Sequence, residues 1–100
     1  MFGPSKPFYM TRAIAEGLPV EHQQFILRYL FEHNHQLTDY LQIYDIYIEN
    51  EQQWLIQRQN EPQQETIIHV EITTDKPINR KVWVMDQVDH NIILFPEDYL

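Results

Sequence analysis

The chain has 100 residues, no cysteine and a formal net charge of −8, from 15 acidic and 7 basic residues. The absence of cysteine excludes disulfides, thiolate catalysis and cysteine-ligated zinc, and the scattered basic residues argue against direct binding of nucleic acid. No apolar run is long enough for a membrane span or a secretory signal. We therefore expect one cytoplasmic domain over residues 1–100, whose acidic residues serve mainly to keep it soluble.

The first third of the chain predicts a strand followed by a helix. Residues 1–7 contain two prolines and are expected to form a flexible lead-in, and residues 8–15 a first strand. Proline favours the first turn of a helix, so a helix is expected over residues 19–33. Its apolar stripe repeats at helical spacing and consists of Val20, Ile26, Leu27, Leu30 and Phe31.

The aromatic residues Phe25 and Tyr29 lie four positions apart next to His22, and helical spacing places them opposite the apolar stripe. They form either a surface pair or part of a contact with another molecule.

From residue 37 onward, apolar residues alternate with a period of two, which indicates strands. Short polar turns separate consecutive runs, so the strands are expected to form hairpins. The runs are 37–50, 53–59, 65–74, 81–86 and 91–95. The pattern predicts an α+β fold in which one N-terminal amphipathic helix packs on a five- to six-stranded, mainly antiparallel sheet.

Several of these strands carry apolar residues on both faces, although one helix is too narrow to cover a sheet of this size. Either the sheet curls over itself, or its second face meets another protein chain. We predict as contact residues Tyr44, Tyr47, Trp54 and Trp83. Packing in the core is the alternative explanation for each of the four.

The histidines do not form a pattern that predicts a metal site. His33 and His35 would point about 200° apart on a helix, so we expect them, with Asn34, to finish the helix instead. His69 alternates within a strand and is expected to pack across it. The pair Asp89-His90 superficially resembles the start of a His-Asn-His nuclease, but the ten residues after it contain no histidine.

Other catalytic motifs are also missing from the sequence. The one serine, Ser5, lies in the expected lead-in, which argues against a Ser-His-Asp triad. The two glycines, Gly3 and Gly17, are too few for a glycine-rich phosphate-binding loop. The carboxylate pairs Asp86–Asp89 and Glu97–Asp98 lie in polar turns, where solvated charge is expected. We therefore assign no catalytic, cofactor-binding or metal-binding residue, although a carboxylate pair formed only in space stays open.

Five segments occur in an order typical of a known family: YMTRAIAEGLPVEHQQFI, DYLQIYDI, RQNEP, KVWVMD and LFPEDYL. In this order, from about Tyr9 to Tyr99, the chain resembles domain of unknown function 960, small proteins of low-GC Gram-positive bacteria and their phages. It departs at His22, where an apolar residue is expected, and in the loop after Val84, which is longer than expected. The resemblance implies the length of the fold and a cytoplasmic setting, but no activity, cofactor or site.

Together these features predict a non-enzymatic protein that binds a protein partner or forms a homodimer, and that binds neither membrane nor nucleic acid directly. The first alternative is an acidic antagonist that mimics DNA and binds a DNA-binding protein. The second is a small hydrolytic enzyme.

Overall fold

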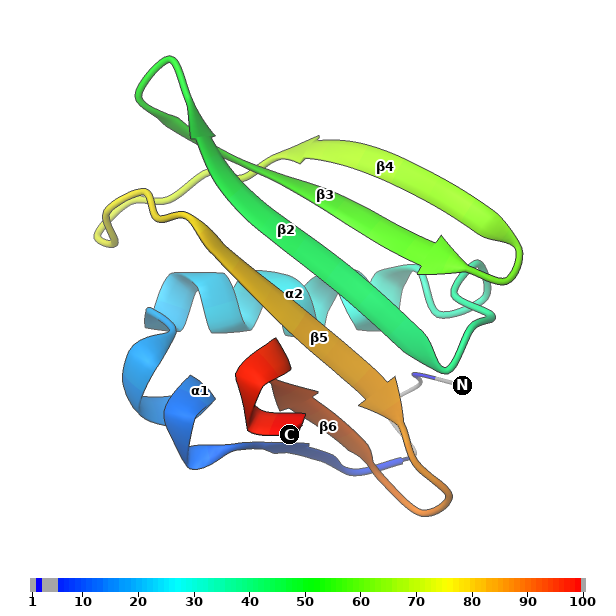
Figure 1. The fold of residues 1–100 in the computed structure, drawn as a ribbon. Coiled ribbons are helices and arrows are strands. Elements are labelled where there is room, and N and C mark those ends of the chain that lie inside the picture. Colours follow the sequence, from blue (N-terminus) through cyan, green and yellow to red (C-terminus); the bar gives the residue numbers. More distant parts are fainter. Residues whose placement is uncertain (1, 3–5, 100) are drawn as a thin grey trace.

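The computed structural model describes residue 2 and residues 6–99, which form a six-stranded sheet with its longest helix packed on one side (Figure 1). The strands run in the order β1-β6-β5-β2-β3-β4. Their bounds are β1 Phe8–Met10, β2 Leu41–Glu49, β3 Gln52–Asn60, β4 Gln63–His69, β5 Arg80–Asp86 and β6 Asn91–Leu94. The helices are α1 Arg12–Gly17, α2 Val20–Glu32 and the short 3-10 helix η1 Pro96–Tyr99.

The α+β class is confirmed, and so are the hairpins β2–β3, β3–β4 and β5–β6, but β5 pairs with β2 and not with β4. The sheet is mainly antiparallel, with one parallel pair. The pairs β2–β3, β3–β4, β2–β5 and β5–β6 are antiparallel, whereas β1 pairs with β6 in parallel. The parallel pair arises because the chain leaves β1 through both helices and four strands before it returns beside β1 as β6.

Helix α2 covers one face of the sheet, and the core lies between the two (Figure 1). Ile26 and Leu30 of α2 are fully buried, as are Tyr44 of β2 and Val82 of β5. Aromatic rings join the layers, since the Tyr29 and Tyr44 ring centroids lie 6.1 Å apart in a T-shaped arrangement.

The buried stripe of α2 differs from the predicted one. Its buried residues are His22, Ile26 and Leu30, while Val20 is 60% exposed. His22 tolerates burial because its Nε2 lies 2.8 Å from Gln53 Oε1, a polar partner that periodicity cannot reveal. Phe25 and Tyr29, expected opposite the buried stripe, pack against the edge of the core.

The predicted strand over residues 8–15 is wrong beyond Met10. Thr11 instead caps α1, because its Oγ1 accepts a hydrogen bond of 3.2 Å from the Ile14 backbone N–H. In the expected flexible lead-in, Phe2 is fully buried and the Pro7 carbonyl accepts a hydrogen bond from Asn91 N. Its flexibility stays a prediction. The rest of that prediction, residues 1 and 3–5, lies outside the described residues.

The predicted strand over residues 65–74 ends at His69, because the chain then leaves the sheet for the start of α2. The Glu21 carboxylate accepts hydrogen bonds from the backbone N–H groups of Thr73, Thr74 and Asp75, at 2.6 to 3.0 Å. The Asp75 carboxylate in turn accepts a hydrogen bond of 2.7 Å from Glu21 N. These bonds tie the segment to the helix, and the backbone donors, Asp75 N first, hold the pKa of Glu21 well below its usual value.

This clamp predicts that Glu21→Gln lowers stability in a pH-dependent way. A carboxyl whose pKa falls on folding stabilises the native state above its unfolded pKa, and this contribution is lost as the pH falls below about 5. The urea midpoints of the wild type and the variant should therefore differ more at pH 7 than at pH 3.

The matched control is Glu16→Gln, because Glu16 forms only an exposed ion pair with Arg12. That change should move the midpoint little at either pH. A difference between wild type and Glu21→Gln that is equal at both pH values would contradict the clamp.

Candidate functional site

The sheet face turned away from α2, here called the outer face, is the candidate functional surface in the part of the chain that is described. Alternate residues along each strand point to it, as the alternating burial of β2 and β3 indicates. Strand register places the following residues on this face: Leu41, Ile43, Asp45, Tyr47, Trp54, Ile56, Arg58, Glu65, Ile67, Lys81, Trp83 and Met85.

Among the described residues, a helix lies on the outer face only at its β5–β6 side, and this helix is the short η1. The Trp83 and Tyr99 ring centroids lie 6.1 Å apart, and Arg80 lies 3.7 Å above the Phe95 ring centroid. Arg80 also donates a hydrogen bond of 2.6 Å to Glu97. The part of the face over β4, β3, β2 and the start of β5 stays open (Figure 1).

Four charged side chains cross the open part in a stepped diagonal, here called the charged row: Glu65, Arg58, Asp45 and Lys81. Register pairs Arg58 with Ile43 and Asp45 with Ile56, so the row shifts by two residues along the strands between β3 and β2. Arg58 Nε lies 3.6 Å from Glu65 Oε2, Arg58 also pairs with Asp45, and Lys81 Nζ lies 3.8 Å from Asp45 Oδ1. One residue comes from each of β4, β3, β2 and β5, and the signs alternate along the row. The row therefore carries no net charge, although the protein carries −8.

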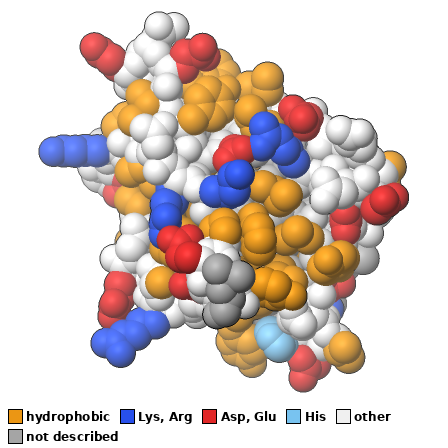
Figure 2. Space-filling view, in the orientation of Figure 1, with side chains coloured by type: hydrophobic (Ala, Val, Ile, Leu, Met, Phe, Trp, Pro, Cys, Tyr) orange, Lys and Arg blue, Asp and Glu red, His pale blue; other side chains and the backbone are white. Residues whose placement is uncertain are grey.

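Apolar side chains flank the charged row on both sides, where Figure 2 shows hydrophobic atoms around the central charges. Toward the β2–β3 turn lies the Tyr47 patch, which consists of Tyr47, Trp54, Ile56 and Ile67. Toward the opposite end lies the Ile43 patch, which consists of Leu41, Ile43, Trp83 and Met85. Most of these side chains are partly exposed, and Ile67 is 64% exposed.

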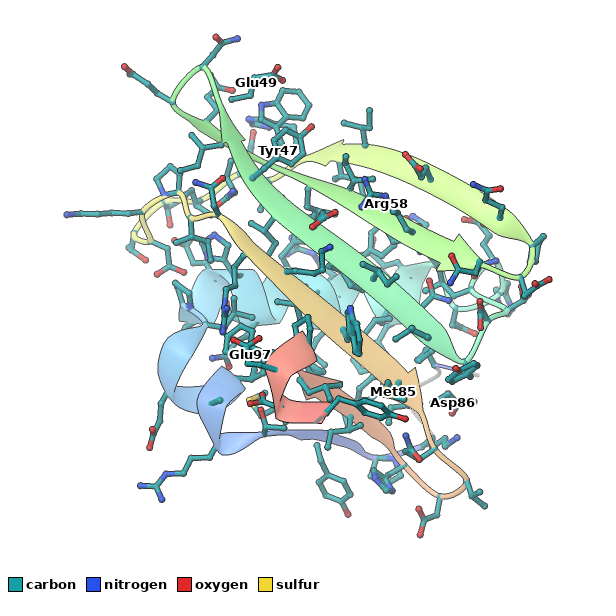
Figure 3. All side chains as sticks on the ribbon, in the orientation of Figure 1. Tyr47, Glu49, Arg58, Met85, Asp86 and Glu97 are labelled. Carbon is teal, nitrogen blue, oxygen red and sulfur yellow. The ribbon has the colours of Figure 1, made fainter. Side chains whose placement is uncertain are left out.

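Three of the four predicted contact residues lie on the outer face. Tyr47 and Trp54 are direct cross-strand partners within the Tyr47 patch, and Figure 3 shows Tyr47 beside the β2–β3 hairpin. Trp83 belongs to the other patch, where it pairs with Ile43. Whether these residues bind a protein stays a prediction.

The prediction for Tyr44 is wrong, because this side chain is fully buried under α2. Tyr44 and Tyr47 differ by three positions, an odd number, so a strand must place them on opposite faces. The charge of Asp45 could have indicated the exposed side, because residues 41, 43, 45 and 47 of β2 share one face. Sequence analysis also missed the charged row, which depends on strand order and register.

His33, Asn34 and His69 take the structural roles that were expected. His33 ends α2, and its Nδ1 lies 3.0 Å from the Tyr29 carbonyl oxygen. Asn34 donates a bond of 2.8 Å to the Phe31 carbonyl, so capping is confirmed. His69 packs across the strands against Trp54, with ring centroids 4.9 Å apart. Within residues 6–99 and residue 2, no cluster of three metal-ligating side chains occurs.

Comparison with known proteins assigns the chain to a family. The model of a family described as Staphylococcal protein of unknown function, DUF960, matches residues 8–98. The chain belongs to this family. The resemblance inferred from the ordered segments is thus confirmed. His22, the departure noted in the sequence, is 2% exposed, so a histidine occupies a core position.

The fold of this DUF960 protein is also found in a crystal structure of a protein of unknown function from Enterococcus faecalis. The two structures agree with a TM-score of 0.84 at 17% sequence identity, over 99% of this chain and 95% of that chain. The likeness concerns the fold alone. No curated protein matches the sequence, and no helix among the described residues is long and apolar enough to cross a membrane.

The two tyrosines of β2 provide a test of which face is buried. Tyr44→Ala should lower the free energy of unfolding by about 3–5 kcal/mol, because it leaves a cavity in the core. Tyr47→Ala should cost about 1 kcal/mol, since it removes only a cross-strand contact at the surface. Urea unfolding at low protein concentration measures both, and equal losses would contradict the placement of the two rings.

Proposed function

We propose that this DUF960 protein is a cytoplasmic, non-enzymatic module that binds another protein surface through its outer sheet face. The observation that supports this most is the uneven cover of the sheet. Helix α2 buries one face, whereas the Tyr47 patch and the Ile43 patch, apart from the buried Met85, stay partly exposed on the other. Contiguous apolar surface of this kind on a folded domain is typical of interaction sites.

The residue types on the outer face suit protein recognition. Tyrosine, tryptophan and arginine contribute most to binding at protein interfaces, because they bury large areas while few rotatable bonds become fixed. Tyr47 and Trp54 are cross-strand partners, and Arg58 lies farther along β3 on the same face. Their backbones are held in the middle of a sheet, so little ordering is needed when a partner binds.

The arrangement of the acidic residues gives less support to the DNA-mimic alternative. Such a protein needs carboxylates spaced along one face like phosphates. Here Glu49 and Glu51 lie at the β2–β3 turn, whereas Glu61 lies at the opposite end of the sheet. Asp45 and Glu65 are paired with bases in the charged row, which leaves the outer face without an acidic track.

The hydrolytic alternative also lacks a supporting arrangement among the described residues. A hollow beside β3 and β4 is lined by His69, Glu71 and Asp75, among others. His69 there contacts Trp54 and Gln52, and Asp75 accepts hydrogen bonds at the start of α2. These polar groups serve structural contacts and do not converge on a common point.

Photo-crosslinking in living cells tests the proposal. A benzophenone amino acid replaces Ile67 on the outer face or, as the matched control, Val20 on α2. The two positions are 64% and 60% exposed. We expect a discrete crosslinked species from position 67 and none from position 20.

The proposal would be abandoned if position 67 gave no crosslink, or if both positions gave the same products. The mass of a crosslinked species separates a second copy of the chain from a different protein.

A further inference from the structure

The alternating signs of the charged row restrict what can lie against the outer face. A row that reads minus, plus, minus, plus is complementary to the same row read in reverse. A two-fold axis in the interface plane, perpendicular to the row at its midpoint, produces this reversal. We infer that the partner of the outer face is a second copy of this chain, placed by such an axis between Arg58 and Asp45. This inference rests on the proposed function.

In this arrangement each charge meets an opposite charge. Glu65 faces Lys81 of the second copy, and Arg58 faces Asp45 of the second copy. A two-fold axis directed along the row would instead place each charged residue against the same residue of the second copy, and like charges repel. The row therefore selects one orientation of the two copies and disfavours the other.

The apolar residues are compatible with the same axis. The axis keeps each patch on its own side of the row, so the Tyr47 patch meets the Tyr47 patch of the second copy. The Ile43 patch likewise meets its own counterpart. Burial of these patches supplies the driving force, while the charged row fixes the relative placement.

Net charge is consistent with this choice of surface. Two copies of −8 repel each other, and an interface rich in carboxylates would add to that repulsion. The charged row has two acids and two bases, so it contributes no net charge where the copies are closest.

Charge reversal at the ends of the row tests the inference. Analytical ultracentrifugation should show a dimer for the wild type, and at least about tenfold weaker dimerisation for Lys81→Glu and for Glu65→Lys. Each variant places like charges together twice in its own homodimer. An equimolar mixture of the two variants should form heterodimers, because all four groups then meet opposite charges.

The mixture separates contacts between copies from contacts within one copy. Any loss of the Lys81–Asp45 or Glu65–Arg58 pair inside a chain persists in the mixture, so only contacts between chains can restore assembly. The controls Lys76→Glu and Glu16→Lys change the net charge equally at exposed positions away from the row, and should leave dimerisation unchanged.

A wild type that stays monomeric at high concentration would overturn the inference, as would variants that do not combine when mixed. If position 67 still crosslinked to a protein of another mass in cells, only the choice of a second copy would fail. If position 67 crosslinked to nothing, the proposed function would fail as well.

Discussion

The structure depends on one constraint: the one long helix, α2 with 13 residues, is too narrow to cover a six-stranded sheet. A helix with its side chains is about 10–12 Å wide, little more than two strand spacings of about 4.8 Å. Helix α2 can therefore cover the middle of one face but not both faces. The inner face becomes the core, and the outer face keeps partly exposed aromatic and aliphatic side chains with four charges among them.

The helix is held over the inner face by polar contacts as well as by apolar packing. His22 and Gln53 are both buried and bonded to each other, and the Glu21 clamp fixes the start of α2 on the segment after β4. Buried glutamines continue this polar layer, since Gln57 donates to Gln42, whose own amide donates to Gln59. Satisfied buried groups favour one arrangement of helix and sheet, because any shift would leave them unpaired.

Much of this fold is predictable from local patterns. Periodicity predicts the helix over residues 19–33 and the succession of strands along the chain. The preferences of helix ends predict the cap at His33. The buried stripe of α2 was predicted incorrectly because histidine and glutamine usually lie at the surface, whereas here His22 and Gln53 are buried and hydrogen-bonded to each other. Tyr44 was misplaced because odd- and even-numbered residues of a strand lie on opposite faces, and the charged Asp45 marks the odd-numbered face of β2 as the exposed one. The charged row could not be predicted, because its members come from four strands whose register only the fold determines.

The central claim is that the open face is covered when two copies meet. Hydroxyl-radical labelling of Trp54, followed by mass spectrometry from low micromolar to near-millimolar protein, measures this directly. Labelling of Trp54 should fall as the concentration rises, while labelling of Tyr40, which is 58% exposed at the start of β2 and outside both patches, stays constant. Equal labelling of Trp54 at every concentration would contradict the account.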